Sequence, residues 1–176
     1  MQPDIARPFL QGVVGNYNGH FDGAEVELVA ILPADIRINL SGSYMASLLK
    51  NVPTAYYGIR DEQGALAPKW MYNGLISKSI MVGPGKLGLQ WDFNYIGDRY
   101  SSVDNTPATF IKGSIVNDAR ITYDLDAQGL QFAVSVDNLS NVARENFNFD
   151  LIASTGSQIQ SYAKPRWWHA SIRKKF

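Results

Sequence analysis

Residues 87–95 alternate without a break between apolar and polar side chains. The apolar positions are Leu87, Leu89, Trp91, Phe93 and Tyr95. A period of two residues is typical of a β-strand with one apolar and one polar face. The same period recurs along the chain and predicts eight strands. We expect them at about residues 9–18, 24–32, 35–46, 70–82, 87–97, 115–125, 130–140 and 164–176.

Two kinds of connection join these strands. The short ones carry residues that favour tight hairpins, and they lie at residues 33–34, 83–86 and 126–129. The alternate connections are mostly long and rich in Asn, Ser, Asp, Gly and Tyr, at residues 47–69, 98–114 and 141–163, with only Gly19 to Gly23 short. Loops of this length usually carry function or disorder. The pattern predicts an antiparallel up-and-down sheet with short turns at one end and long loops at the other.

The alternation also gathers polar side chains on one face of the predicted sheet. These are Glu25, Glu27, Arg37, Gln90, Asp92, Asn94, Asp118, Arg120, Asp137, His169 and Arg173. In a transmembrane β-barrel the polar face lines the lumen and the apolar face meets lipid. Three features favour that arrangement: aromatic residues near strand ends, one-sided loop lengths, and Phe176 at the end of the last strand. The polar residues then form either a selectivity lining or a solvated wall whose charges pair across strands.

Composition and charge exclude several kinds of partner and chemistry. The chain has 16 Lys and Arg against 16 Asp and Glu, so its net charge gives no reason to expect nucleic acid binding. No apolar run is long enough for a membrane helix, and the amino end lacks a secretory-signal pattern. Either a signal has been removed or the chain is part of a longer protein. Cysteine is absent, which excludes disulfides and thiol chemistry.

Motifs for catalysis or cofactor binding are weak. Residues 83–88 spell G-x-G-x-x-G, but the next residues alternate as a strand, whereas a dinucleotide site needs a helix there. His20 and His169 have neither the spacing nor the cysteine neighbours of a metal motif. No G-x-S-x-G motif occurs. We therefore expect no enzymatic activity, no metal and no cofactor.

Several short segments together resemble the last third of the barrel of TonB-dependent receptors. In order they are Gly23 to Leu28, Pro68-Lys69-Trp70, Tyr95 to Tyr100, Val136 to Asn141, and Lys164 to Trp168 running on to Phe176. The resemblance covers nearly the whole chain from about Phe9. One departure is Lys174, two residues before the terminal Phe, where the family often has an aromatic or apolar residue.

The resemblance implies a bacterial outer-membrane barrel of about 22 strands with a plugged lumen, of which residues 1–176 form a single barrel-segment domain. The implied function is uptake of a scarce nutrient such as a metal chelate or an oligosaccharide. The implied partners are outer-membrane lipid, the remaining strands, and a plug that connects to the TonB system. Neither plug nor TonB box is present in residues 1–176, so we expect this chain alone not to be an energised transporter. The short turns are expected on the periplasmic side and the long loops outside the cell.

Aromatic residues in the long loops are candidates for contact with a small-molecule substrate. They are Tyr56, Tyr57, Tyr100, Phe147, Phe149 and Tyr162. Aromatic-lined pockets bind ligands, but ordinary loops also use tyrosine for packing.

Two other architectures remain open at this stage. Eight strands is an even number, so the first and last run antiparallel and permit a self-closing membrane barrel of structural or adhesive role. A soluble lipocalin-like barrel would instead bury the apolar face around a lipophilic ligand.

Overall fold

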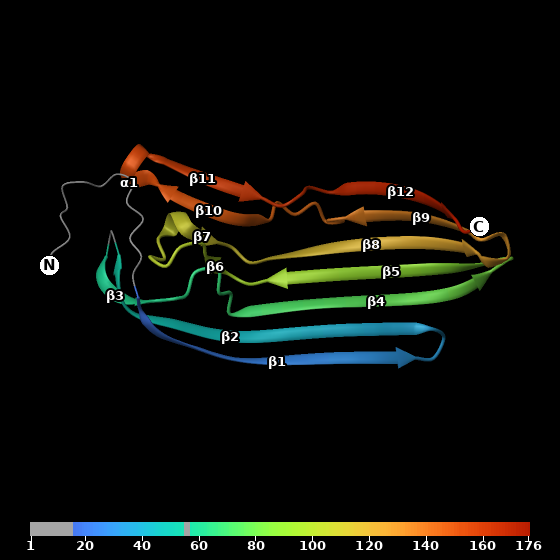
Figure 1. Cartoon of the computed structure of the whole chain (residues 1–176), viewed down its shortest axis with the longest axis horizontal. Helices are drawn as coiled ribbons and strands as arrows, with labels where there is room; N and C mark the ends of the chain where they lie inside the picture. Colours follow the sequence, from blue (N-terminus) through green and yellow to red (C-terminus); the bar gives the residue numbers. More distant parts are fainter. Residues whose placement is uncertain (1–15, 55–56) are drawn as a thin grey trace.

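The computed structural model describes residues 16–54 and 57–176 and is all-β, with antiparallel sheets. Long strands follow one another across the main sheet, each beside its predecessor (Figure 1). They are β1 (Asn18–Leu32), β2 (Ile36–Thr54), β4 (Trp70–Val82), β5 (Gly85–Ile96), β8 (Ser114–Leu125), β9 (Leu130–Asp137) and β12 (Trp167–Lys174). A short strand, β3 (Gly58–Glu62), pairs with the far end of β2. The predicted antiparallel up-and-down order is confirmed.

Three tight turns connect neighbouring strands at one end of the sheet, which we call the turn end. The β1–β2 turn contains Ala34 and Asp35 with φ of 63° and 54°, and Gly83 between β4 and β5 has φ of 57°. The β8–β9 turn is a single 3-10 turn, η2 (Asp126–Gln128), closed by Gly129 with φ of 61°. Positive φ is the conformation that tight hairpins require. All three predicted hairpins are therefore confirmed.

The opposite end of the sheet, the loop end, is more ordered than a set of loops. The second long connection contains β6 (Arg99–Tyr100), η1 (Pro107–Thr109) and β7 (Phe110–Ile111). The third contains β10 (Glu145–Leu151), α1 (Ile152–Thr155) and β11 (Ser157–Tyr162), which form a hairpin of their own. The interpretation of these segments as loops was thus partly wrong. Their strands pair locally and do not join the main sheet.

The amino-terminal prediction also needs correction. The strand expected at residues 9–18 lies mostly outside the described residues, which begin at residue 16. The expected turn from Gly19 to Gly23 is wrong, because these residues continue β1 opposite Leu49 to Met45 of β2. A Cβ atom on Gly19 would stand 2.7 Å from the Leu48 carbonyl oxygen, and one on Gly23 would stand 2.7 Å from that of Tyr44. Glycine here permits close approach of two strands rather than a reversal of the chain.

Strand direction bears on closure of the sheet. Every neighbouring pair from β1 to β12 is antiparallel, and an odd number of strands lies on this path. β1 and β12 therefore run in the same direction, from the loop end to the turn end (Figure 1). Within the described residues they do not pair, and the sheet is open at both edges. The expectation that the first and last strands are antiparallel and suited to direct closure is wrong for this set of strands.

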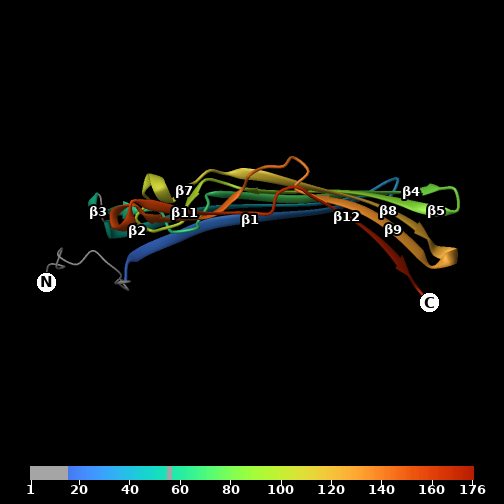
Figure 2. The same ribbon diagram turned by 90° about the horizontal axis from the view of Figure 1, so that it is seen from above.

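Within residues 16–54 and 57–176 the main sheet is a single, gently curved layer (Figure 2). Only the long connections reach its polar face, at the loop end. Apolar side chains such as Val26 and Ile172 stay exposed, at 69% and 71% of their full accessibility. The most buried side chains lie at the loop end instead, and they are Val52, Thr109, Ile111 and Asn148. We call residues 58–67, 98–113 and 141–163 the loop layer. It holds most of the compact core of the described structure.

Asn148 connects the long connections within the loop layer. Its Nδ2 donates to the Phe110 carbonyl oxygen at 3.0 Å and to Glu145 Oε2 at 2.9 Å. Its own carbonyl oxygen accepts from the Ser101 hydroxyl. Asp150 Oδ2 accepts from the Thr106 hydroxyl at 3.0 Å, which adds a second link between these connections.

We predict that Asn148→Ala lowers the free energy of unfolding by about 1–3 kcal/mol, because two partly buried acceptors lose their donor. Urea denaturation measures this loss, and hydrogen exchange should locate it in β7 and β10. Asn146→Ala is the matched control, since Asn146 is exposed on the same strand, and it should stay within about 0.5 kcal/mol of wild type. Equal effects of the two substitutions would contradict a connecting role for Asn148.

Candidate functional site

The polar side chains predicted from the sequence lie together on one face of the main sheet. Strand register aligns Arg37, Ser77, Gln90, Arg120, Ser135 and His169 in one row from β2 to β12. Directly opposed residues in antiparallel strands share a face. The other predicted residues fall on the same face, and they are Glu25, Glu27, Asp92, Asn94, Asp118, Asp137 and Arg173.

Charge on this polar face is segregated along the strands. Toward the loop end lies an acidic band, which consists of Glu25, Glu27, Asp92, Asp118 and Asp137. Toward the turn end lies a mainly basic band, which consists of Arg37, Lys86, Arg120, His169 and Arg173, with one carboxylate, Asp124, opposite Lys86. Arg37, Lys86 and Arg120 border a shallow hollow of about 330 Å³ together with Ser77, Gln90 and Thr122. Such separation gives the face a field directed along the strands.

Few of these charges are neutralised by a partner. Asp137 lies 3.7 Å from Lys164 Nζ and 3.5 Å from His169 Nε2. Asp92 accepts from Gln90 Nε2 at 2.8 Å, and Asp118 accepts from the Asn138 backbone N–H at 2.7 Å. Among described residues, Arg37, Lys86 and Arg120 make no ion pair within 4.0 Å. The expected pairing of wall charges across strands is therefore limited to the neighbourhood of Asp137.

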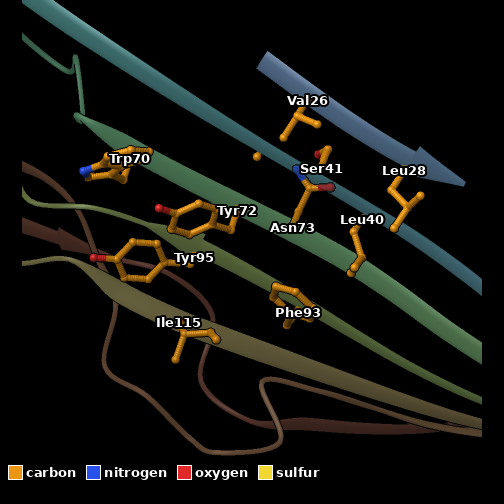
Figure 3. Close-up of a pocket in the computed structure, with 11 residues that line it drawn as sticks. Val26, Leu28, Leu40, Ser41, Trp70, Tyr72, Asn73, Phe93, Tyr95 and Ile115 are labelled. Carbon is orange, nitrogen blue, oxygen red and sulfur yellow. The ribbon is translucent and has the colours of Figure 1, made fainter. Parts of the chain in front are cut away.

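The apolar face carries an aromatic belt at the loop end. Ring centroids are 4.6 Å apart for Tyr44 and Trp70, 5.9 Å for Trp70 and Tyr72, and 5.7 Å for Tyr72 and Tyr95. In Figure 3 the hydroxyls of Tyr72 and Tyr95 point the same way, toward the end where Trp70 lies. Trp168 departs from the expected position near the end of the sheet. It pairs with Val136, in the row that also holds Ala119 and Trp91, and so lies near the middle of the apolar face.

A groove of about 770 Å³ runs from this belt along the apolar face (Figure 3). Its lining includes Val26, Leu28, Leu40, Tyr72, Phe93, Tyr95 and Ile115. Gly74 lies beneath the ring of Phe93, where a Cβ atom would stand 2.4 Å from Cε1. Glycine at this position lets the ring lie flat against the backbone of the neighbouring strand.

The aromatic residues proposed as substrate contacts lie on different elements of the loop layer and its border. Tyr56 lies outside the described residues, and Tyr57 lies under the Arg60 guanidinium at 4.0 Å. Tyr100 packs against Phe110 at 5.4 Å. Phe147 stacks on Phe149 at 6.3 Å, and the Tyr162 hydroxyl donates to Gln160 at 3.1 Å. These contacts do not by themselves define a common pocket.

The structure brings forward polar residues that sequence reasoning missed. Arg99 is only 6% exposed, and its Nη2 donates to the Glu145 carbonyl oxygen at 2.9 Å. Arg144 Nη1 reaches down to the polar face and donates to Asn94 Oδ1 at 3.0 Å. Burial lowers the pKa of Arg99, and the nearby Arg144 lowers it further, while Glu145 raises it. No alternation marks these residues in the sequence, and although Arg99 lies in the Tyr95 to Tyr100 segment, nothing in that segment indicates its burial.

Comparison with known proteins adds no relative. No protein-family model matches the chain, and no curated protein matches it significantly. The resemblance to TonB-dependent receptors therefore stays a prediction. In the described part of the chain no helix is long and apolar enough to cross a membrane. Across residues 16–54 and 57–176, no three His, Asp or Glu side chains converge to hold a metal ion.

The acidic band makes a prediction about stability. Asp92 and Asp118 are directly opposed on neighbouring strands, and like charges so placed repel each other. We predict that Asp92→Asn raises the free energy of unfolding by about 0.2–1 kcal/mol. Asparagine keeps an oxygen that accepts from Gln90. Chemical denaturation at neutral pH measures the change.

Glu25→Gln is the matched control for this prediction. Glu25 belongs to the same band but opposes Ser43, so its neutralisation should leave stability nearly unchanged. A loss of stability in Asp92→Asn would mean that the carboxylate makes a favourable interaction instead.

Proposed function

We propose that this chain is a wall segment of a bacterial outer-membrane β-barrel of the TonB-dependent receptor type. In this proposal the apolar face meets lipid, the polar face lines a conduit, and the loop layer faces the outside. The parent receptor takes up a scarce nutrient such as a metal chelate or an oligosaccharide. The observation that carries the proposal is a single-layer sheet with an uncovered apolar face bordered by an aromatic belt. A soluble protein would need a second layer over that face.

The height of the apolar band supports the proposal. Trp70, in the aromatic belt, and Ile80, near the turn end, are ten residues apart along β4. At about 3.4 Å per residue this is about 34 Å along the strand. Strands tilted by about 35–45° then span about 24–28 Å, close to the apolar height of about 25 Å in outer-membrane barrels. Tyr123 and Phe132 lie in the same row as Ile80. They place aromatic residues at the turn-end boundary of the apolar band, opposite the aromatic belt.

Lys78 is an exception on the apolar face, where it pairs with Leu89. It lies one same-face position from Ile80 and two from Val82, so it is close to the turn-end boundary. A lysine there can bury its methylenes along the apolar surface and extend its ammonium to the interface. Its position is thus compatible with lipid contact.

The open edges support a segment rather than a complete small barrel. Backbone groups in lipid must be paired, so β1 and β12 each need a neighbour. Because β1 and β12 run in the same direction, antiparallel closure needs an odd number of additional strands. We propose that the rest of the receptor supplies them, and that its plug supplies the link to the TonB system. The polar face, with its acidic and basic bands, then determines which nutrient passes through the conduit.

We predict that Ile38→Arg impairs membrane insertion and Asn39→Arg does not. Ile38 lies on the apolar face in the row of Ile76 and Trp91, near the middle of the band, whereas Asn39 lies on the polar face. Arginine at mid-bilayer on the lipid side costs about 2–4 kcal/mol. Refolding into vesicles, followed by denaturant titration, measures the difference. Equal costs for these adjacent positions would exclude lipid contact by this face.

The open edges generate a second prediction. The isolated chain in detergent should associate through β1 and β12, because their outer amides and carbonyls have no partners in the sheet. Light scattering should report species larger than one chain, and hydrogen exchange should protect the β5 and β8 amides more than those of the two edges. A monodisperse monomer with fully protected edges would instead favour a self-closing barrel.

A further inference from the structure

Polar atoms without partners gather where the loop layer meets the polar face. Arg99 Nη1, Arg144 Nε, Ser114 Oγ and Asn148 Oδ1 are all buried and make no hydrogen bond to described residues. Ser114 opposes Ile96 while Asn94 opposes Val116, so Ser114 lies diagonally beside the residue that binds Arg144. Buried polar groups are rarely left unpaired, and each such group calls for an explanation.

The existing hydrogen bonds fix the orientation of these side chains. Arg99 is held through Nη2 by Glu145, and Arg144 is held through Nη1 by Asn94. Asn148 cannot exchange its amide oxygen and nitrogen, because Nδ2 already donates to two acceptors, Phe110 and Glu145. The unpaired atoms thus find no partner by rotation of Arg99, Arg144 or Asn148, and only the Ser114 hydroxyl can turn. They comprise two charged N–H donors, one hydroxyl, and one acceptor.

The charge balance at this place is positive. Within the described residues neither arginine makes an ion pair within 4.0 Å, and the Glu145 carboxylate, which accepts from Asn148 Nδ2, offsets only one of the two positive charges. Arginine stays protonated in proteins, so two positive charges remain close together. A buried charge without a partner is strongly unfavourable. Arg144 is half-buried, whereas Arg99 is almost fully buried.

We propose that Arg99 and Arg144 bind a small oxyanion of the carboxylate or phosphate class at the base of the loop layer. One anion oxygen accepts from Arg99 Nη1 and another from Arg144 Nε, as guanidinium donors favour. The Ser114 hydroxyl provides a third donor. Asn148 Oδ1 accepts from a hydroxyl of the ligand, such as the proton of hydrogen phosphate. This site goes beyond the proposed function and requires neither membrane insertion nor transport.

Isothermal titration of the full chain in detergent tests the site. Inorganic phosphate and citrate are titrated separately at low salt, which distinguishes a phosphate site from a carboxylate site. We expect saturable binding of at least one of them, and Arg144→Gln should weaken it by at least about tenfold through loss of a charge-assisted hydrogen bond. Arg166→Gln removes the same charge from an exposed position in the same connection and should leave binding unchanged.

A second variant keeps the test decisive if Arg144→Gln disturbs the loop layer. Ser114→Ala leaves both arginines in place and should weaken binding about two- to tenfold, as expected for a neutral hydrogen bond. Absence of saturable binding for both anions, or equal weakening in Arg144→Gln and Arg166→Gln, would overturn the proposal and assign water to the unpaired atoms. The titration measures anion binding to each chain, whereas the Ile38→Arg experiment measures insertion into vesicles. A negative result in one is therefore distinguishable from a negative result in the other.

Discussion

Lateral hydrogen bonding between neighbouring strands is the interaction on which the rest of the structure depends. In the described part of the chain no second layer covers the main sheet, so its strands are held by their ladders and by side-chain contacts within each face. Interior strands pair on both sides over most of their length, whereas within the described residues β1 and β12 pair on one side only. Under the proposed function, lipid covers the large apolar face and further strands pair with both edges.

The loop layer is held together differently from the main sheet. It is small, and its buried residues include Asn105, Thr106, Thr109 and Asn148, so polar bonds rather than apolar area organise it. Asn105 exchanges hydrogen bonds with the backbone of Gln63, 42 residues away along the chain. The backbone N–H of Leu66 donates to the Tyr100 carbonyl oxygen at 2.7 Å. These contacts tie the first long connection to the second, and Asn148 ties the third to the second through Phe110.

Most of the main sheet could be predicted from the sequence because its information is local. Alternation in residues 87–95 determines which side chains share a face, and Gly83 and Gly129 mark turns with positive φ. The wrong prediction at the amino end arose because glycine occurs in two kinds of structure. Gly19 and Gly23 permit close strand approach, although glycine-rich segments also form turns. Arg99, Arg144 and Asn148 are brought together by contacts between distant segments, and no local pattern in the sequence records such contacts.

The shared direction of β1 and β12 has a consequence for self-recognition. Two copies of this sheet can extend it in antiparallel fashion only by joining β1 to β1 or β12 to β12, because β12 beside β1 of a copy in the same orientation would be parallel. Either antiparallel contact is related by a twofold axis perpendicular to the sheet, which places the loop layers of the two copies at opposite ends. Proteins inserted into one membrane all face the same way. If the chain spans a membrane as proposed, antiparallel homodimers of this kind are therefore forbidden there, although detergent permits them, and an antiparallel neighbour at either edge has to be a chain segment of different sequence.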